Sequence, residues 1–161
     1  MENQHSYFVR ASSTTPRSGI IGADDIHPPI AFSAPPEFQG VAGTWTPEHF
    51  FTAAVASCFV STFSGMSLVS KFDFLSLELS TEAILQRDEG GWRFTRVILR
   101  PRLTIQIERD RDRGLRLMEK AEKVCLVARS LSCPTALEPE IVVESGAAQP
   151  GAGAGYVARK P

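Results

Sequence analysis

Cysteine is scarce in this sequence, with three residues among 161, and no two of them form a C-x-x-C pair. An odd number of cysteines with such spacing does not match a disulfide framework or the common arrangements of zinc ligands. Net charge is also nearly absent, because 17 basic residues oppose 18 acidic ones. A chain with no strong field of either sign is a poor candidate for binding nucleic acid or an anionic membrane surface.

A secretory signal is missing as well, since the first residues, MENQHSYFVR, contain no basic segment followed by an apolar one. We therefore expect a cytoplasmic protein with reduced thiols. Hydrophobic residues make up 43% of the chain and charged residues 22%, which is typical of a globular domain and not of a disordered chain or a multi-span membrane protein. The length predicts one domain with a core of its own.

Charge is absent from residues 50–69, a run long enough to cross a bilayer. Six serines and threonines lie within it and no basic cluster flanks it, so we predict a helix buried within protein on nearly every side. Thr46 suits the N-cap, Pro47 the first helical position and Glu48 the first turn. These signals predict a helix from Pro47 to about Ser70.

A helix that is apolar all round must be covered on all sides, and a chain of this length has little else with which to cover it. Small residues recur at helical spacing and form a groove into which another helix can pack closely. These residues are Ala53, Ser57, Ser61 and Ser64. The pattern favours an obligate dimer, and the alternative is that the chain's own sheet and second helix cover this one.

Short patterns of extended structure surround this helix in the sequence. Those before it, at 7–12, 19–23 and 30–33, predict a small antiparallel meander. Those after it, at 75–86 and 92–107, predict a long hairpin. Pro101 lies in the second arm, where its missing N–H marks an edge or a bulge.

The last third of the chain predicts a second helix and a final strand. The charged run 108–113 is predicted as a solvated loop, and the apolar spacing from Leu117 to Leu131 predicts an amphipathic helix that Pro134 ends. Residues 141–143 are a short strand pattern. The expected order is βββ-α-ββ-α-β, an α+β domain over 1–145, followed by a flexible Gly/Ala-rich tail over 146–161.

The cysteines are the strongest candidates for chemistry. Cys58 lies in the middle of the first helix and Cys125 on the buried face of the second, whereas Cys133 lies next to Pro134. Each can be a small buried hydrophobe without further role. Two central helices must pack on one another, however, and this packing can bring Cys58 and Cys125 together as a peroxidatic and resolving pair requires. Such chemistry needs a thiolate, and since 50–69 contains no Lys or Arg, a cation must come from elsewhere in the fold.

The segment PEFQGVAGTWTPEHFFTAAVASCF, followed after the hairpin by KAEKVCLVARSL and then EPEI, resembles the OsmC/Ohr family of organic hydroperoxide reductases. The resemblance covers roughly residues 7–143. It implies antiparallel sheets around two central helices in an intertwined homodimer with two sites at the interface. It also implies a peroxidatic Cys58, a resolving Cys125 and an acidic Glu48.

The family's catalytic arginine lies in an N-terminal turn, where Arg17 matches best and Arg10 is the reserve candidate. Glu48 and Cys58 are ten residues apart, about 15 Å along one helix, so they cannot touch within a chain. Arg17 must therefore link a Cys58 to a Glu48, with the other subunit as one source of that carboxylate. The expected role of Arg17 is to lower the pKa of the Cys58 thiol and to polarise the leaving oxygen, while Glu48 holds Arg17 in place.

The expected reaction is reduction of an organic hydroperoxide through a Cys58 sulfenic acid and a Cys58–Cys125 disulfide, in oxidative stress defence. Apolar residues would line the substrate pocket, namely Trp45, Phe50, Phe51 and Phe59. The resemblance implies a dithiol reductant, dihydrolipoamide-like, with no metal and no bound cofactor. Two other readings remain open: a dimeric module that binds an apolar small molecule without turnover, and zinc binding through Cys125, Cys133 and His49.

Overall fold

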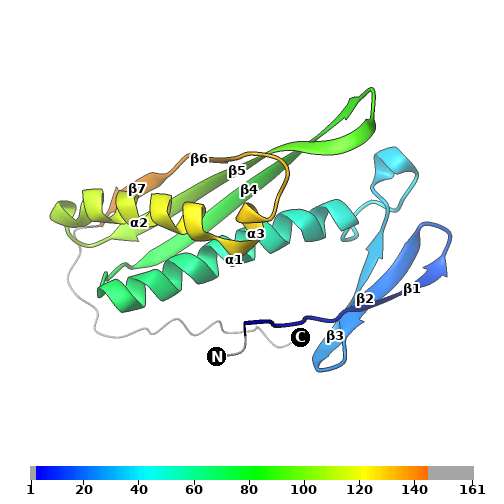
Figure 1. Cartoon of the computed structure of the whole chain (residues 1–161), viewed down its shortest axis with the longest axis horizontal. Helices are drawn as coiled ribbons and strands as arrows, with labels where there is room; N and C mark the ends of the chain where they lie inside the picture. The colour runs from blue at the N-terminus through cyan, green and yellow to red at the C-terminus, as the bar shows by residue number, and fades with distance from the viewer. Residues whose placement is uncertain (1–2, 145–161) are drawn as a thin grey trace.

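The computed structural model describes residues 3–144 and has an α+β architecture. The predicted tail at 146–161 lies outside the described residues. The elements in chain order are β1 (Arg10–Thr15), β2 (Ser18–Ala23), β3 (Ile26–Ser33), η1 (Pro36–Phe38), α1 (Pro47–Ser70), β4 (Ser76–Asp88), β5 (Gly91–Ile105), η2 (Glu108–Asp110), α2 (Arg111–Val124), α3 (Leu126–Arg129), β6 (Thr135–Leu137) and β7 (Glu140–Val143) (Figure 1).

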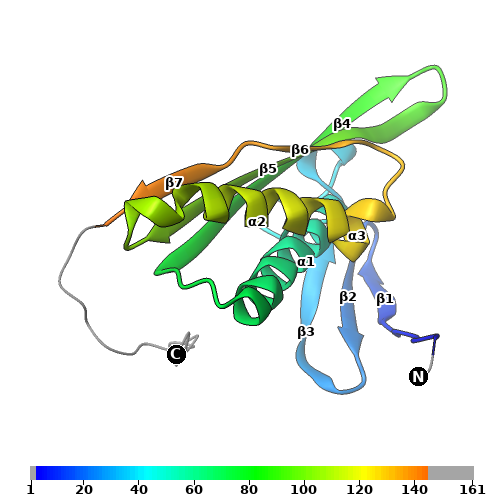
Figure 2. The ribbon, with the colours of Figure 1, turned by 60° about the vertical axis from the view of Figure 1, so that its left-hand side comes forward.

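The first three strands form the antiparallel meander that the sequence predicts, in the order β1-β2-β3. This sheet lies near the N-terminal end of α1, on the side opposite β4 and β5 (Figures 1 and 2). Its contacts with the rest of the described chain are sparse. A bridge between Phe32 and Trp45, together with a hydrogen bond from Arg17 to the Phe38 carbonyl, ties it to the segment that enters α1. The meander therefore has little of its own chain to pack against.

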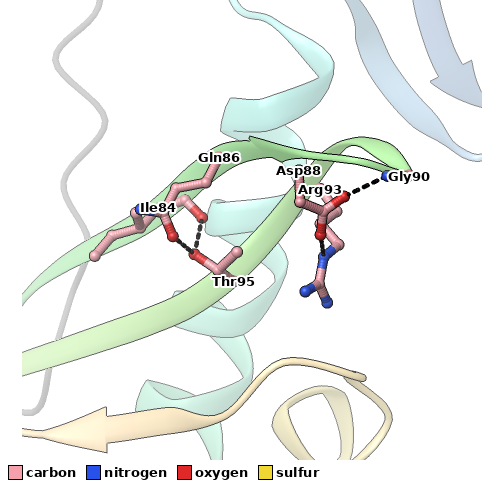
Figure 3. A network of polar contacts seen from close by, with 6 residues as sticks. All are labelled: Ile84, Gln86, Asp88, Gly90, Arg93 and Thr95. Atoms are coloured by element: carbon pink, nitrogen blue, oxygen red, sulfur yellow. Dashed lines mark hydrogen bonds and ion pairs between the residues drawn. The ribbon is translucent and has the colours of Figure 1, made fainter.

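The second sheet is built on the predicted hairpin of β4 and β5, to which β6 and β7 add in parallel on the far side of β5. The hairpin tip projects beyond the helices (Figure 1). A bulge at Thr95 interrupts the pairing, and the Thr95 hydroxyl donates to the Gln86 side chain at 2.6 Å (Figure 3). At the turn, the Asp88 carboxylate accepts hydrogen bonds from the Gly90 N–H at 2.8 Å and the Arg93 guanidinium at 2.5 Å (Figure 3).

The prediction that Pro101 marks an edge or a bulge is wrong, because Pro101 lies buried in the central strand. In this part of β5 the backbone N–H and C=O groups of the odd-numbered residues point toward β6 and β7. The hydrogen bond from the Val97 N–H to the Pro134 carbonyl shows this direction. The backbone nitrogen of Pro101, which carries no hydrogen, lies opposite the gap between the end of β6 at Leu137 and the start of β7 at Glu140. No ladder hydrogen bond is lost there, which is why the strand tolerates proline.

Helix α1 has the bounds that its local signals predict. Thr46 accepts a hydrogen bond from the His49 backbone N–H at 3.3 Å, and the His49 Nδ1 accepts one from the Thr46 N–H at 3.2 Å, which completes a capping box. At the other end, Arg113 donates to the carbonyls of Ser70 and Lys71. These contacts satisfy groups that every helix leaves without intrahelical partners.

Within the single chain, the expected burial of α1 is met on one face only. Only the face that carries Val55, Phe59, Phe63 and Ser67 is buried against the second sheet and α2. Other apolar residues of the helix lie open, as Val69 does with 88% of its surface exposed. The helix is long and apolar enough to span a membrane by length and composition alone, a criterion that core helices of soluble proteins also meet.

The second predicted helix is not continuous. Helix α2 ends at Val124, Cys125 has an extended ψ of 118°, and α3 starts at Leu126. The charged run 108–113 is also not a loop, because its residues form η2 and the first turn of α2. The ψ of Cys125 turns the amides that follow it away from the carbonyls of α2, since the intrahelical ladder requires helical torsions at every residue.

Candidate functional site

Helix α3 packs against α1 (Figure 2), and Cys58 of α1 and Cys125, the residue before α3, lie close to each other. Cys58 is half-buried in the middle of α1, and Cys125 is fully buried at the break between α2 and α3. Both are free thiols, and they lie close enough for each to shift the pKa of the other. The structure therefore brings together the two cysteines that the sequence places on separate helices.

The pKa of the Cys58 thiol is lowered by its surroundings. Burial opposes this shift and raises the pKa, but four hydrogen bonds outweigh it: those of the Cys125 thiol, the Val127 N–H, the Thr62 hydroxyl and the Leu126 N–H. Donors aimed at a sulfur stabilise the thiolate more than the thiol. Cys58 is therefore the more readily ionised member of the pair.

The pKa of the Cys125 thiol is raised to about 11 by burial first, and then by its hydrogen bond to Cys58 and the repulsion between the two sulfurs. Hydrogen bonds from the Ala128 and Val127 N–H groups oppose this shift without overcoming it. At neutral pH the pair therefore consists of a Cys125 thiol that donates a hydrogen bond to Cys58. This asymmetry suits a nucleophile and a thiol that attacks later.

Backbone amides help to stabilise the Cys58 thiolate, a role that the sequence predicted for a cation. The amides of Leu126, Val127 and Ala128 are those that the break at Cys125 turns out of the helical ladder, and they donate to the two sulfurs. Sequence reasoning missed them because LVAR reads as a continuation of the preceding helix. No local signal such as proline or glycine marks the break.

Arg17 and Arg10 lie apart from the cysteine pair. Arg17 occupies the turn between β1 and β2 with a left-handed φ of 69°, and its guanidinium donates to the Phe38 carbonyl at 2.7 Å. Arg10 forms an exposed ion pair with Asp24 at 2.8 Å. Within residues 3–144, no hydrogen bond or ion pair joins either arginine to Cys58 or Glu48.

Glu48 lies half-buried in the first turn of α1, and its Oε2 is buried without a hydrogen-bond partner in the described part of the chain. A buried carboxylate oxygen normally has a partner, because an unpaired one loses its hydration without compensation. The single chain thus leaves Glu48 in need of a donor that its described residues do not supply.

The aromatic residues proposed for the substrate pocket separate into two groups. Trp45 stacks on Phe50 with centroids 5.7 Å apart, and Phe51 stacks on Phe94 at 4.0 Å, all near the N-terminal end of α1. Phe59 instead lies fully buried in the hydrophobic core. Its place on the buried face of α1 makes Phe59 part of the core, so its predicted position in the pocket lining is wrong for the single chain.

The zinc reading receives no support from the described residues. Among residues 3–144, no three His, Cys, Asp or Glu side chains cluster closely enough to bind a metal ion. Cys125, Cys133 and His49 are therefore not brought together, and the His49 Nδ1 is engaged in the capping box of α1. Cys133 lies half-buried in the loop before β6.

Comparison with known proteins agrees with the fold and with the sequence motifs. The family model described as OsmC-like protein matches residues 40–140. The uncharacterized protein YmaD of Bacillus subtilis is 22% identical over 145 residues, which cover 88% of this chain and 97% of YmaD.

Two solved structures share the fold. An OsmC-like protein of unknown function from Vibrio cholerae superposes with a TM-score of 0.75 at 19% identity, over 84% of this chain and 99% of its own. An organic hydroperoxide resistance protein OsmC from Legionella pneumophila gives a TM-score of 0.70 at 22% identity, over 88% and 100% of the two chains. The family match spans more than half of the sequence and the fold agrees with it, so this chain belongs to the OsmC-like family.

Proposed function

We propose that this protein is a thiol-dependent peroxidase that reduces organic hydroperoxides through Cys58 and Cys125. The observation that carries the proposal is the contact between the two thiols, with the pKa of Cys58 lowered and that of Cys125 raised to about 11. The kinship with an organic hydroperoxide resistance protein supports the choice of substrate class. We place the reaction in the cytoplasm, in defence against oxidative stress.

The reaction proceeds in three balanced steps. The Cys58 thiolate attacks the terminal oxygen of the hydroperoxide, the O–O bond breaks, and the departing alkoxide takes a proton to leave as an alcohol, with Cys58 oxidised to a sulfenic acid. The Cys125 thiol then attacks the Cys58 sulfur, and a water molecule leaves as the disulfide forms. A dithiol of the dihydrolipoamide kind reduces the disulfide and becomes a disulfide itself, so the protein needs no bound cofactor or metal.

We further propose that the working unit is an intertwined homodimer. The open faces of α1, the sparsely packed meander and the unpartnered Glu48 Oε2 each need a second surface. A partner subunit supplies all three, and it is the simplest source of the arginine that Glu48 lacks. In this arrangement Arg17 leaves the Phe38 carbonyl, pairs with a Glu48 and reaches a Cys58 across the interface, where it polarises the leaving oxygen.

Trp45, Phe50 and Phe51 form the apolar wall that favours an organic over an inorganic peroxide. Their stacked arrangement at the N-terminal end of α1 lies beside a hollow lined by Arg17, Phe32 and other residues of the meander. Aromatic surface of this kind gains from contact with an alkyl or aryl group and gains little from hydrogen peroxide.

The test is turnover of cumene or tert-butyl hydroperoxide by the pure protein with dihydrolipoamide. Cys58→Ser should abolish turnover, Cys125→Ser should stop after one oxidation with a sulfenic acid that dimedone traps, and the control Cys133→Ser should retain turnover. If the wild type shows no turnover and its thiols stay reduced in excess peroxide, the proposal fails. The interface would then be tested as a binding site for an apolar small molecule.

A further inference from the structure

The hydroxyl of Thr62 differs from three other hydroxyls of α1 in what it contacts. Those of Thr52, Ser67 and Ser70 donate to the carbonyl four residues earlier, at 2.8–2.9 Å, which is the usual bond for such residues inside a helix. The Thr62 hydroxyl instead lies 4.0 Å from the Sγ of Cys58, one helical turn before it. Its proton is therefore available to the sulfur and not committed to the backbone.

We propose that Thr62 is a further catalytic residue, whose hydroxyl donates a hydrogen bond to the Cys58 thiolate. The assignment deepens the peroxidase function proposed above and rests on it for the identity of Cys58 as the nucleophile. No partner residue or cofactor is needed for this contact, because Thr62 and Cys58 lie on the same helix.

The chemistry of the contact favours the charged sulfur. A hydroxyl next to a thiol can donate or accept, but next to a thiolate it can only donate, so the bond stabilises the thiolate more than the thiol. The direction agrees with the lowered pKa of Cys58, to which this hydroxyl contributes. Threonine suits the position because its β-branched side chain has few rotamers in a helix.

The position of the donor also matters. The Leu126 and Val127 amides and the Cys125 thiol approach Cys58 from the α2–α3 segment, so they depend on how that segment docks. Thr62 is one turn away on α1 itself, and its contact is independent of that docking. Thr62 thus keeps a donor on the Cys58 sulfur when Cys125 moves to form or leave a disulfide.

The experiment measures alkylation of Cys58 by iodoacetamide across pH in the reduced full-length protein, with the Cys58 peptide quantified by mass spectrometry. It needs neither peroxide nor reductant, so it reports on Thr62 even if the peroxidase function is wrong. In Thr62→Val the midpoint of the profile should rise by roughly half a unit to one unit, which is about a five-fold loss of thiolate at pH 7. Thr62→Ser, which keeps the hydroxyl, should stay close to wild type.

Thr52→Val is the matched control, because it removes a hydroxyl from the same helix that bonds to the Glu48 carbonyl and not to a sulfur. It should leave the Cys58 profile unchanged. Thr62→Ala serves as a second variant if Thr62→Val does not fold, with the same expected shift. A Thr62→Val or Thr62→Ala profile that overlays that of the wild type would overturn the assignment, as would an equal shift in Thr52→Val.

Discussion

Cys58 and Cys125 have the same side chain and touch each other, yet their pKa values shift in opposite directions. The difference arises from where each sulfur lies relative to the break in the second helix. Cys58 receives two of the freed amides, the Thr62 hydroxyl and the Cys125 proton, whereas for Cys125 burial dominates. The roles of nucleophile and resolving thiol thus follow from position and not from residue type.

This asymmetry predicts the order in which the two thiols ionise. Alkylation requires the thiolate, so in the native protein Cys58 should be modified with a midpoint below that of an ordinary cysteine. Cys125, with a pKa of about 11, should be modified with a midpoint well above that of Cys58. Peptide mass spectrometry after pulses of iodoacetamide checks this.

Denatured protein is the control, since unfolding removes both environments and should merge the two midpoints. Native midpoints that coincide, or that appear in the reverse order, would contradict the assignment of Cys58 as the nucleophile. The measurement also separates ionisation from access, because restricted access of the reagent slows the modification of Cys125 at every pH, whereas the raised pKa moves the midpoint.

At the level of elements, the ends of α1 and the turn of the hairpin could be predicted from sequence because their signals are local. Thr46 and Pro47 mark the start of the helix, and residues 88–91 mark the turn, within a few positions of each other. The three residues of β6 and the break at Cys125 could not be predicted in this way. Both depend on pairing and packing with segments far along the chain, and LVAR alone has the composition of a helix.

The break predicts that proline is tolerated at position 126. Leu126 is the first residue of α3, and Cys125 before it has φ −57° and ψ 118°, which are torsions that a following proline accepts. Leu126→Pro should therefore fold with a melting temperature within a few degrees of wild type. It also removes an N–H that donates to Cys58, so the midpoint of Cys58 alkylation should rise.

Val127→Pro is the contrasting variant, because it places the ring one residue later, after a residue whose helical torsions it disfavours. It should lower the melting temperature by several degrees more than Leu126→Pro does. Equal losses of stability in the two variants would show that the chain runs through position 125 as an ordinary helix.

At the level of the whole molecule, the single chain is incomplete as a packed body. One stripe of α1 is buried while Leu68 and Val69 are 81% and 88% exposed, and the meander has few contacts with the helices. The sequence predicted a helix that needs covering and favoured a partner subunit over the chain itself as its cover. The cysteine pair could be predicted from the expected packing of the two helices, whereas the positions of Arg17 and Glu48 relative to it depend on the assembly.

The proposed dimer predicts that a charge on the open face of α1 disrupts association. Ser61 is exposed in the single chain and belongs to the small-residue groove, so Ser61→Arg should raise the dissociation constant roughly a hundred-fold or more, because an unpaired charge buried in an interface is strongly unfavourable. Sedimentation at micromolar concentration measures the shift from dimer to monomer. Ser132→Arg, at an exposed position in the loop before β6, is the control and should remain dimeric.

The origin of Arg17 at each site can be tested by mixing inactive variants. If Arg17 acts on the Cys58 of the partner, a heterodimer of Arg17→Ala and Cys58→Ser contains one complete site and should regain up to half of the wild-type turnover per dimer. If Arg17 acts within its own chain, both sites of the heterodimer lack a residue and turnover should stay absent. Unmixed variants, dissociated and reassociated in the same way, are the controls.

The helix break at Cys125 also distinguishes a stationary sulfur from a movable one. Cys58 is anchored within a 24-residue helix, whereas Cys125 joins a helix of 14 residues to one of four. When a disulfide forms between the sulfurs, the backbone around Cys125 would therefore move, and α1 would keep its position. Oxidation would then make the backbone of residues 125–129 more rigid. The amide hydrogens of these residues should exchange more slowly in the disulfide form than in the dithiol form.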